Sequence, residues 1–118
     1  MSPDPGLAPD RPKMPRASLE KVAEIFSAFA DATRLAILQE LRHGRQSVGE
    51  LVACLGTSQA NVSKHLKLLH QAGLLKRERE GLQVFYKVAE ESVFEVCKFA
   101  CRRLNDNAQS AITEDYFI

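Results

Sequence analysis

Residues 47–69, SVGELVACLGTSQANVSKHLKLL, determine the fold that we expect for this chain. Residues 47–55 have the apolar spacing of a short helix, Gly56 and Thr57 interrupt it, and a second helix is expected over residues 58–69. Two helices joined by a tight turn that uses glycine form a helix-turn-helix. The apolar positions expected to pack these helices together, and onto the helix before them, are Val48, Leu51, Leu55, Val62, Leu66 and Leu69.

The outer face of the helix over residues 58–69 carries side chains that suit the grooves of DNA. Gln and Asn pair with adenine through two hydrogen bonds, Lys reaches guanine or phosphate, and Ser contacts either. A polar face is also what any solvated helix presents, and a histidine there can pack locally instead of contacting a base. The candidate residues are Ser58, Gln59, Asn61, Ser63, Lys64, His65 and Lys67.

Two strands are predicted next, over residues 74–80 and 82–88, because these stretches are rich in Leu, Val, Phe and Tyr and flank Gly81. This hairpin carries Arg77, Arg79 and Gln83, which we expect to lie along the DNA backbone as a wing. The plainer alternative is a hairpin that merely contains arginines.

Charge is distributed unevenly along the chain, although the formal net charge is only +1. Residues 58–88 contain six Lys or Arg against two Asp or Glu, whereas residues 1–57 are balanced and residues 89–118 are acidic. A basic block that coincides with a helix-turn-helix and its hairpin is typical of a surface that binds duplex DNA.

The remaining elements complete a mainly α fold with one β-hairpin, in the order helix, helix, helix, helix, hairpin, helix. Ser18 is expected to cap the first helix, Asp31 caps the second, and the last opens at Glu90 or Ser92. Residues 1–17 hold all five prolines and predict a disordered tail, followed by a winged helix-turn-helix domain over residues 18–104. Residues 105–118 form a C-terminal extension that either continues the last helix or frays.

Length and composition narrow the class of protein. A chain of 118 residues fits one domain, and it contains no apolar run long enough for a membrane span and no pattern of a secretory signal. Three cysteines without framework spacing favour a reducing, cytoplasmic setting. No arrangement of Ser, His, Asp and Cys supports catalysis, so we expect no enzyme.

Three segments together resemble the ArsR/SmtB family of bacterial winged-helix repressors. They are FADATRLAIL at 29–38, SQANVSKHL at 58–66 and LHQAGLL at 69–75, within a match that spans about residues 18–104. The resemblance implies a homodimer built from the first and last helices. It also implies binding to double-stranded operator DNA and release from it when an inducer binds.

The resemblance also bears on which metal ion or small molecule acts as the inducer, mostly through family motifs that this chain lacks. The last helix has no histidine of the kind that zinc and cobalt sensors use, and Ser47-Val48-Gly49 stands where arsenic and cadmium sensors often have Cys-x-Cys. Cys97 and Cys101 instead lie one helical turn apart. Two such thiols suit a thiophilic ion such as As(III), Sb(III), Cd(II) or Cu(I), or a reactive sulfur species or oxidant.

One alternative to a thiol sensor stays open at this point. Cys97 and Cys101 can be small apolar residues in the dimer interface, in which case the protein binds DNA without sensing a ligand. If the thiols do sense a signal, the dimer axis can bring both pairs together as four thiols. Cys54, on the short helix before the turn, is interpreted as a core residue.

Overall fold

The first helix begins earlier than its sequence suggests. The computed structural model describes residues 11–108 and 116–118, and in it helix α1 spans Arg16–Phe29 with Pro15 as its N-cap. The backbone N–H of Ser18 donates to the carbonyl of Pro15 at 3.0 Å, so Ser18 lies inside the helix and the expected Ser18 cap is wrong. Pro15 has the extended backbone of an N-cap residue, and its carbonyl also accepts the backbone N–H of Leu19 at 3.1 Å. Most of the predicted tail, residues 1–10, lies outside the described residues.

The next three helices begin at side-chain caps. Helix α2 spans Ala32–Leu41, and the Asp31 carboxylate accepts the backbone N–H of Arg34 at 3.0 Å, which confirms the predicted cap. Helix α3 spans Val48–Leu55 and starts with a capping box, in which Ser47 and Glu50 bond each other's backbone N–H. It ends at Gly56, whose φ of 66° is left-handed, and helix α4 then covers Gln59–Gln71.

The sheet has three strands where the sequence predicted two. Strand β2 spans Leu75–Glu80 and pairs antiparallel with β3, Gln83–Val88, around the turn at Gly81. The additional strand β1, Gln46–Ser47, pairs with the other edge of β3, which gives the order β1-β3-β2. Two residues carry almost no periodicity, so local sequence could not reveal β1.

Helix α5 spans Ser92–Ala108 and therefore runs into the C-terminal extension. Continuation of the last helix was one of the two possibilities for residues 105–118, and the helix continues as far as Ala108. Residues 109–115 lie outside the described part of the chain. Beyond them, the backbone N–H of Tyr116 donates to the side-chain oxygen of Asn105 at 2.9 Å, and Ile118 packs against the core. The end of the chain thus contacts both α5 and the body of the domain.

The core lies where α2, α3 and α4 meet beneath the sheet. Its fully buried side chains are Ile37, Leu38, Leu51, Val62, Leu66 and Leu69. Four of the six predicted packing positions are among them, and the other two, Val48 and Leu55, pack partly buried at the edge of the same cluster. Among the helices of the described residues, none is long and apolar enough to cross a membrane.

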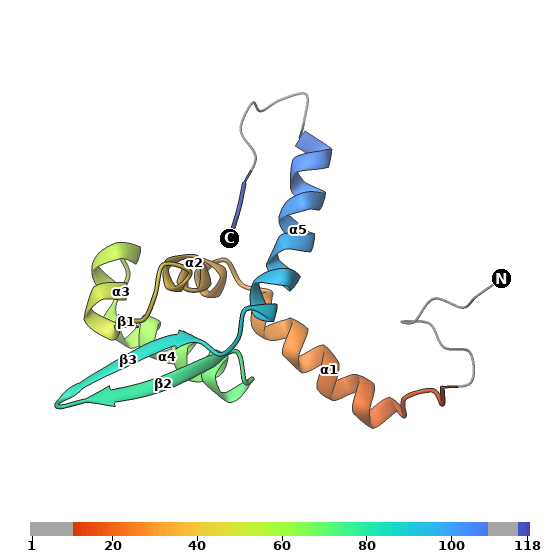
Figure 1. The fold of residues 1–118 in the computed structure, drawn as a ribbon, viewed down its shortest axis with the longest axis horizontal. Helices are drawn as coiled ribbons and strands as arrows, with labels where there is room; N and C mark the ends of the chain where they lie inside the picture. Colours follow the sequence, from red (N-terminus) through yellow and green to blue (C-terminus); the bar gives the residue numbers. More distant parts are fainter. Residues whose placement is uncertain (1–10, 109–115) are drawn as a thin grey trace.

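Helices α1 and α5 extend away from this core in different directions (Figure 1). Both present large apolar side chains to solvent, which a single copy of the chain leaves uncovered. On α1 these are Leu19, Val22, Ile25 and Phe26, and on α5 they are Val96, Phe99 and Leu104. A group of exposed apolar side chains along one helix, as on α1 and on α5, is typical of an interaction surface.

Candidate nucleic-acid interface

The outer face of α4 is free of ion pairs among the described residues. Gln59, Ser63, Lys64 and Lys67 are all exposed, and neither lysine has a carboxylate within ion-pair distance in that part of the chain. Their neighbours Val62 and Leu66 point into the core on the opposite side of the helix. The helical period therefore divides α4 into a buried face and a face that offers hydrogen bonds and positive charge.

At the start of α4, two predicted contact residues also hold the helix itself. The Ser58 hydroxyl accepts the backbone N–H of Asn61 at 3.1 Å and so caps the helix. The side-chain amide of Asn61 donates to the Thr57 hydroxyl at 3.0 Å. Thr57, expected only to form the turn, thereby orients the amide of Asn61. This amide keeps its oxygen and its second N–H for other partners.

His65 does not belong to the outer face, contrary to the prediction. Its ring is 6% exposed, and Nδ1 lies 3.2 Å from a terminal nitrogen of Arg34. Guanidinium groups only donate hydrogen bonds, so Nδ1 is the acceptor and the ring proton sits on Nε2. His65 is therefore a packed residue, as the alternative interpretation had allowed, and it cannot reach a base edge in this conformation.

The hairpin separates its polar side chains between two faces. Residues paired across strands share a face and alternate along each strand, so the register Arg77–Tyr86 and Arg79–Val84 places both arginines with Tyr86. Tyr86 meets the ring of His70 on α4, with centroids 6.4 Å apart. Arg77 and Arg79 thus share the sheet face directed toward α4, whereas Gln83 pairs with Glu80 on the opposite face and separates from them.

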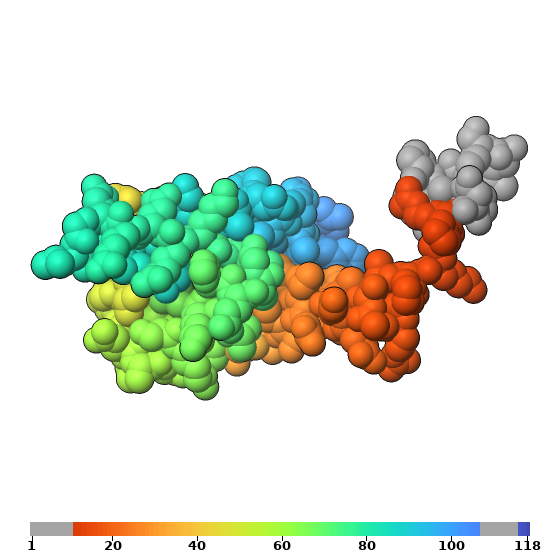
Figure 2. All heavy atoms as spheres, turned by 90° about the horizontal axis from the view of Figure 1, so that it is seen from below, coloured from red at the N-terminus to blue at the C-terminus, as the bar shows by residue number. Residues whose placement is uncertain are grey.

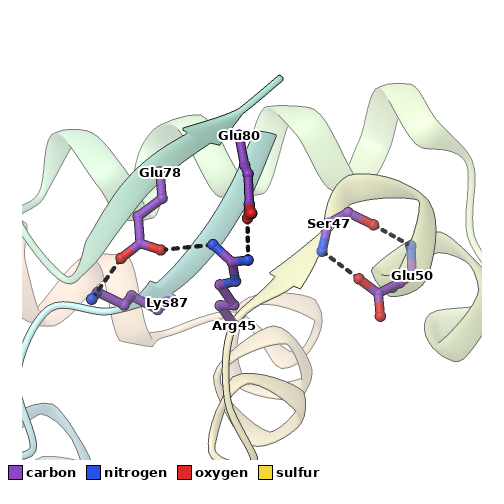
Figure 3. A network of polar contacts seen from close by, with 6 residues as sticks. All are labelled: Arg45, Ser47, Glu50, Glu78, Glu80 and Lys87. Carbon is purple, nitrogen blue, oxygen red and sulfur yellow. Dashed lines mark hydrogen bonds and ion pairs between the residues drawn. The ribbon is translucent and has the colours of Figure 1, made fainter. Parts of the chain in front are cut away.

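On the opposite face both glutamates of the hairpin are held in ion pairs (Figure 3), whereas Lys76 is exposed there without an ion-pair partner among the described residues. Arg45, from the loop before β1, donates to Glu78 at 3.2 Å and also to Glu80, and its guanidinium stacks 4.2 Å above the ring of Phe85. Lys87 pairs with Glu78 at 2.6 Å. The hydrogen bonds from Lys87 and then Arg45 lower the pKa of Glu78, and those to Glu80 and then Glu78 raise the pKa of Arg45.

Helix α4 and strand β2 lie side by side (Figures 1 and 2), so the exposed lysines of α4 lie near Arg77 and Arg79 of β2. Lys64, Lys67, Arg77 and Arg79 are exposed and have no ion-pair partner among the described residues. The acidic side chains of the hairpin are taken up by Arg45 and Lys87 on the other face. The positive stretch found in the sequence is therefore concentrated further by folding.

The three cysteines lie in three different environments. Cys97 is 2% exposed within the core of its own protomer, and burial, followed by the neighbouring Cys101, raises the pKa of its thiol. Cys101 is half-buried, and Cys54 is exposed, so the interpretation of Cys54 as a core residue is wrong. No cluster of three metal-ligating side chains occurs within residues 11–108 and 116–118.

Cys97 and Cys101 face away from Phe99 but share their side of α5 with the exposed Leu104, which lies seven residues after Cys97. Phe99, two residues from each cysteine, lies about 200° away around the helix and is 67% exposed. Cys101 lines a cavity of about 550 Å³ between α5, the end of α2 at Arg42 and the terminal residues Tyr116–Ile118. Cys97 is already buried within a single copy of the chain.

Known proteins that are similar to this chain have the same kind of DNA-binding domain. Residues 29–78 match the model of a helix-turn-helix domain. The chain is 35% identical over 94 residues to the transcriptional repressor SmtB of Mycobacterium tuberculosis, covering 80% of this chain and 70% of that protein. It is 41% identical over 80 residues to a helix-turn-helix transcriptional regulator of Methanocaldococcus jannaschii, covering 67% and 90%. The chain belongs to the ArsR/SmtB family.

Solved structures agree with this ArsR/SmtB assignment. A homodimeric winged helix-turn-helix DNA-binding domain from Mycobacterium bovis superposes with a TM-score of 0.71 at 25% identity, covering 92% of this chain and 99% of that one. NolR from Sinorhizobium fredii gives a TM-score of 0.70 at 29% identity, covering 78% and 94%. The relatives are transcriptional regulators, so this chain is a DNA-binding regulator of the repressor type and not an enzyme.

Proposed function

We propose that this protein is a homodimeric repressor that reads an operator with α4 in the major groove and Arg77 and Arg79 on the flanking phosphates. The observation that carries the proposal is that both glutamates of the hairpin lie on one face, while Arg77 and Arg79 lie together on the other. Two arginines without ion-pair partners in the described residues face the side of α4, while Arg45 is bound by two glutamates on the other side. A protein that used the hairpin only structurally would gain nothing from this asymmetry.

Dimerisation is proposed through the exposed apolar side chains of α1 and α5. A single copy exposes 57% of Phe26 and 67% of Phe99, and the similar domain from Mycobacterium bovis is homodimeric. A two-fold dimer predicts a pseudo-palindromic operator whose half-sites are about 34–36 Å apart, one helical turn. The cytoplasm is where such a regulator would meet its operator.

The test is the ratio of operator to random-duplex affinity. An operator is selected in vitro from a random library, and binding is then measured by fluorescence anisotropy at fixed salt. Lys64→Ala should weaken operator binding, whereas Lys98→Ala, on the cavity side of α5, should not. Equal affinity of the wild type for operator and random duplex would favour the alternative, a winged helix that binds DNA without sequence preference.

The signal is proposed to act on the thiol pair of α5. Cys101 lines a cavity and lies one turn from Cys97, so a thiophilic ion or a reactive sulfur compound would reach Cys101 first. The raised pKa of the buried Cys97 thiol favours the competing hypothesis, that the cysteines are only structural.

The two hypotheses are separated by titrating the operator complex. Each agent is added separately to the operator complexes of wild type, Cys97→Ser and Cys101→Ser. The agents are As(III), Sb(III), Cd(II), Cu(I), a persulfide donor and peroxide. A sensor releases DNA with at least one agent and loses that response in Cys101→Ser. If no agent changes operator affinity, the cysteines are structural and the inducer acts elsewhere.

A further inference from the structure

A single arginine joins the helix proposed for dimerisation to the helix proposed for DNA reading. The Arg34 side chain is 12% exposed and lies where α1 ends, α2 begins and α4 passes. Its Nε donates to the carbonyl of Ala28 at 2.8 Å, and one terminal nitrogen donates to the carbonyl of Ser27 at 3.1 Å. The other terminal nitrogen donates to Nδ1 of His65 at 3.2 Å.

The first two contacts fix the end of α1. Carbonyls in the last turn of a helix lack the usual partner four residues ahead, and here Arg34 binds two of them, of which that of Ser27 also accepts the backbone N–H of Ala30 at 3.0 Å. Only Ala28 and Phe29 of α1 are buried, so little apolar packing holds this helix against the body of the domain. The direction in which α1 leaves the domain therefore depends strongly on Arg34.

The third contact fixes α4. His65 is the only buried polar side chain of the described residues, and its ring accepts the hydrogen bond that Arg34 directs into the domain. Its neighbour Lys64 and the nearby Lys67 are exposed on the outer face. Holding the His65 ring therefore sets the rotation of α4 about its own axis, and with it the direction of the two lysines.

We propose that Arg34 and His65 are a positioning pair that fixes the angle between α1 and α4, and so the separation of the two recognition helices in the dimer. The pair touches no DNA itself. It acts because both ends of one rigid, planar guanidinium are occupied, by α1 carbonyls on one side and by α4 on the other. This inference rests on the proposed dimer, in which α1 contacts the partner copy.

The experiment compares His65→Asn with His65→Leu. Asparagine places its side-chain oxygen the same number of bonds from the backbone as Nδ1, so it preserves the acceptor, whereas leucine fills the space without one. Operator affinity is measured on the selected site and on sites with one central base pair added or removed. Each such change moves the half-sites by about 3.4 Å and rotates them by about 35°.

We expect wild type and His65→Asn to prefer the selected spacing. His65→Leu should bind that site about tenfold more weakly, because a charged donor loses its buried partner, and should discriminate less among the three spacings. Arg34→Lys, which retains the charge but concentrates its donors on one nitrogen in place of a planar fork, should behave like His65→Leu. It also provides a second variant if leucine prevents folding, which thermal unfolding would reveal.

Two results would overturn the positioning role. One is that His65→Leu retains both the affinity and the spacing preference of the wild type. The other is that His65→Asn loses them as fully as His65→Leu, because a residue needed only for packing would not be rescued by the acceptor. Failure of the wild type to bind any duplex would refute the proposed function instead. The pair is then judged by ¹⁵N NMR of the imidazole, which must find Nδ1 unprotonated and Nε2 protonated.

Discussion

Replacing one arginine on each face of the hairpin tests whether only one face contacts DNA. Arg79 is exposed on the face directed toward α4 and has no ion-pair partner among the described residues, whereas Arg45 on the other face pairs with Glu78 and Glu80. Arg79→Gln and Arg45→Gln each remove one positive charge from the same small sheet. A difference between the variants therefore reports the position of the charge rather than its amount.

The magnitude follows from counterion release. Each phosphate that a protein neutralises contributes about 0.9 to the slope of log K against log salt, so losing Arg79 from both copies of a dimer should reduce the slope by about 1.8. If wild type and Arg79→Gln bind equally at 1 M salt, the variant is about 60-fold weaker at 0.1 M. For Arg45→Gln the slope should change by less than half as much, because its charge is already balanced and distant charges are screened within about 10 Å.

Operator binding is measured by fluorescence anisotropy between 0.05 and 0.4 M salt, a range of roughly one decade. Thermal unfolding of each variant shows that the sheet remains folded. Equal slopes for Arg79→Gln and wild type would refute the assignment of this face, and a larger loss for Arg45→Gln would place the DNA on the opposite side of the hairpin.

Three further predictions concern caps and thiols. Ser58→Ala should lower the free energy of unfolding by about 1 kcal/mol in chemical denaturation, because α4 loses its N-cap. The backbone N–H of Arg34 lowers the pKa of Asp31 in the folded protein. The stability that ionised Asp31 contributes is therefore complete above the unfolded pKa near 3.9 and is lost as pH falls through the lower folded pKa. The free energy of unfolding of Asp31→Asn should depend less on pH between about 5 and 2. Alkylation followed by mass spectrometry should modify Cys54 first, Cys101 next and Cys97 last, and a Cys97 that reacts as fast as Cys54 would contradict its burial.

Local sequence predicted most of the secondary structure because its signals are local. Asp31 and Ser58 cap helices by bonding an N–H only three residues ahead, and Gly56 ends α3 through its own backbone angle. The hairpin follows in the same way from two strand-forming stretches around Gly81. The Ser18 cap failed because the helix begins one turn earlier, where the carbonyl of Pro15 already accepts the backbone N–H groups of Ser18 and Leu19.

What the tertiary structure decided depends on partners far along the chain. His65 and Arg34 are 31 residues apart. The helical period of α4 alone does not show that a buried position on this helix lies next to the hydrogen-bond donors of Arg34. Arg45 and Glu80 are 35 residues apart, so the ion pairs on one hairpin face became visible only once β1 was placed beside β3. Sequence determined which residues could offer charge to DNA. Folding decided which of those charges remain free, because an ion pair depends on the distance between side chains in space.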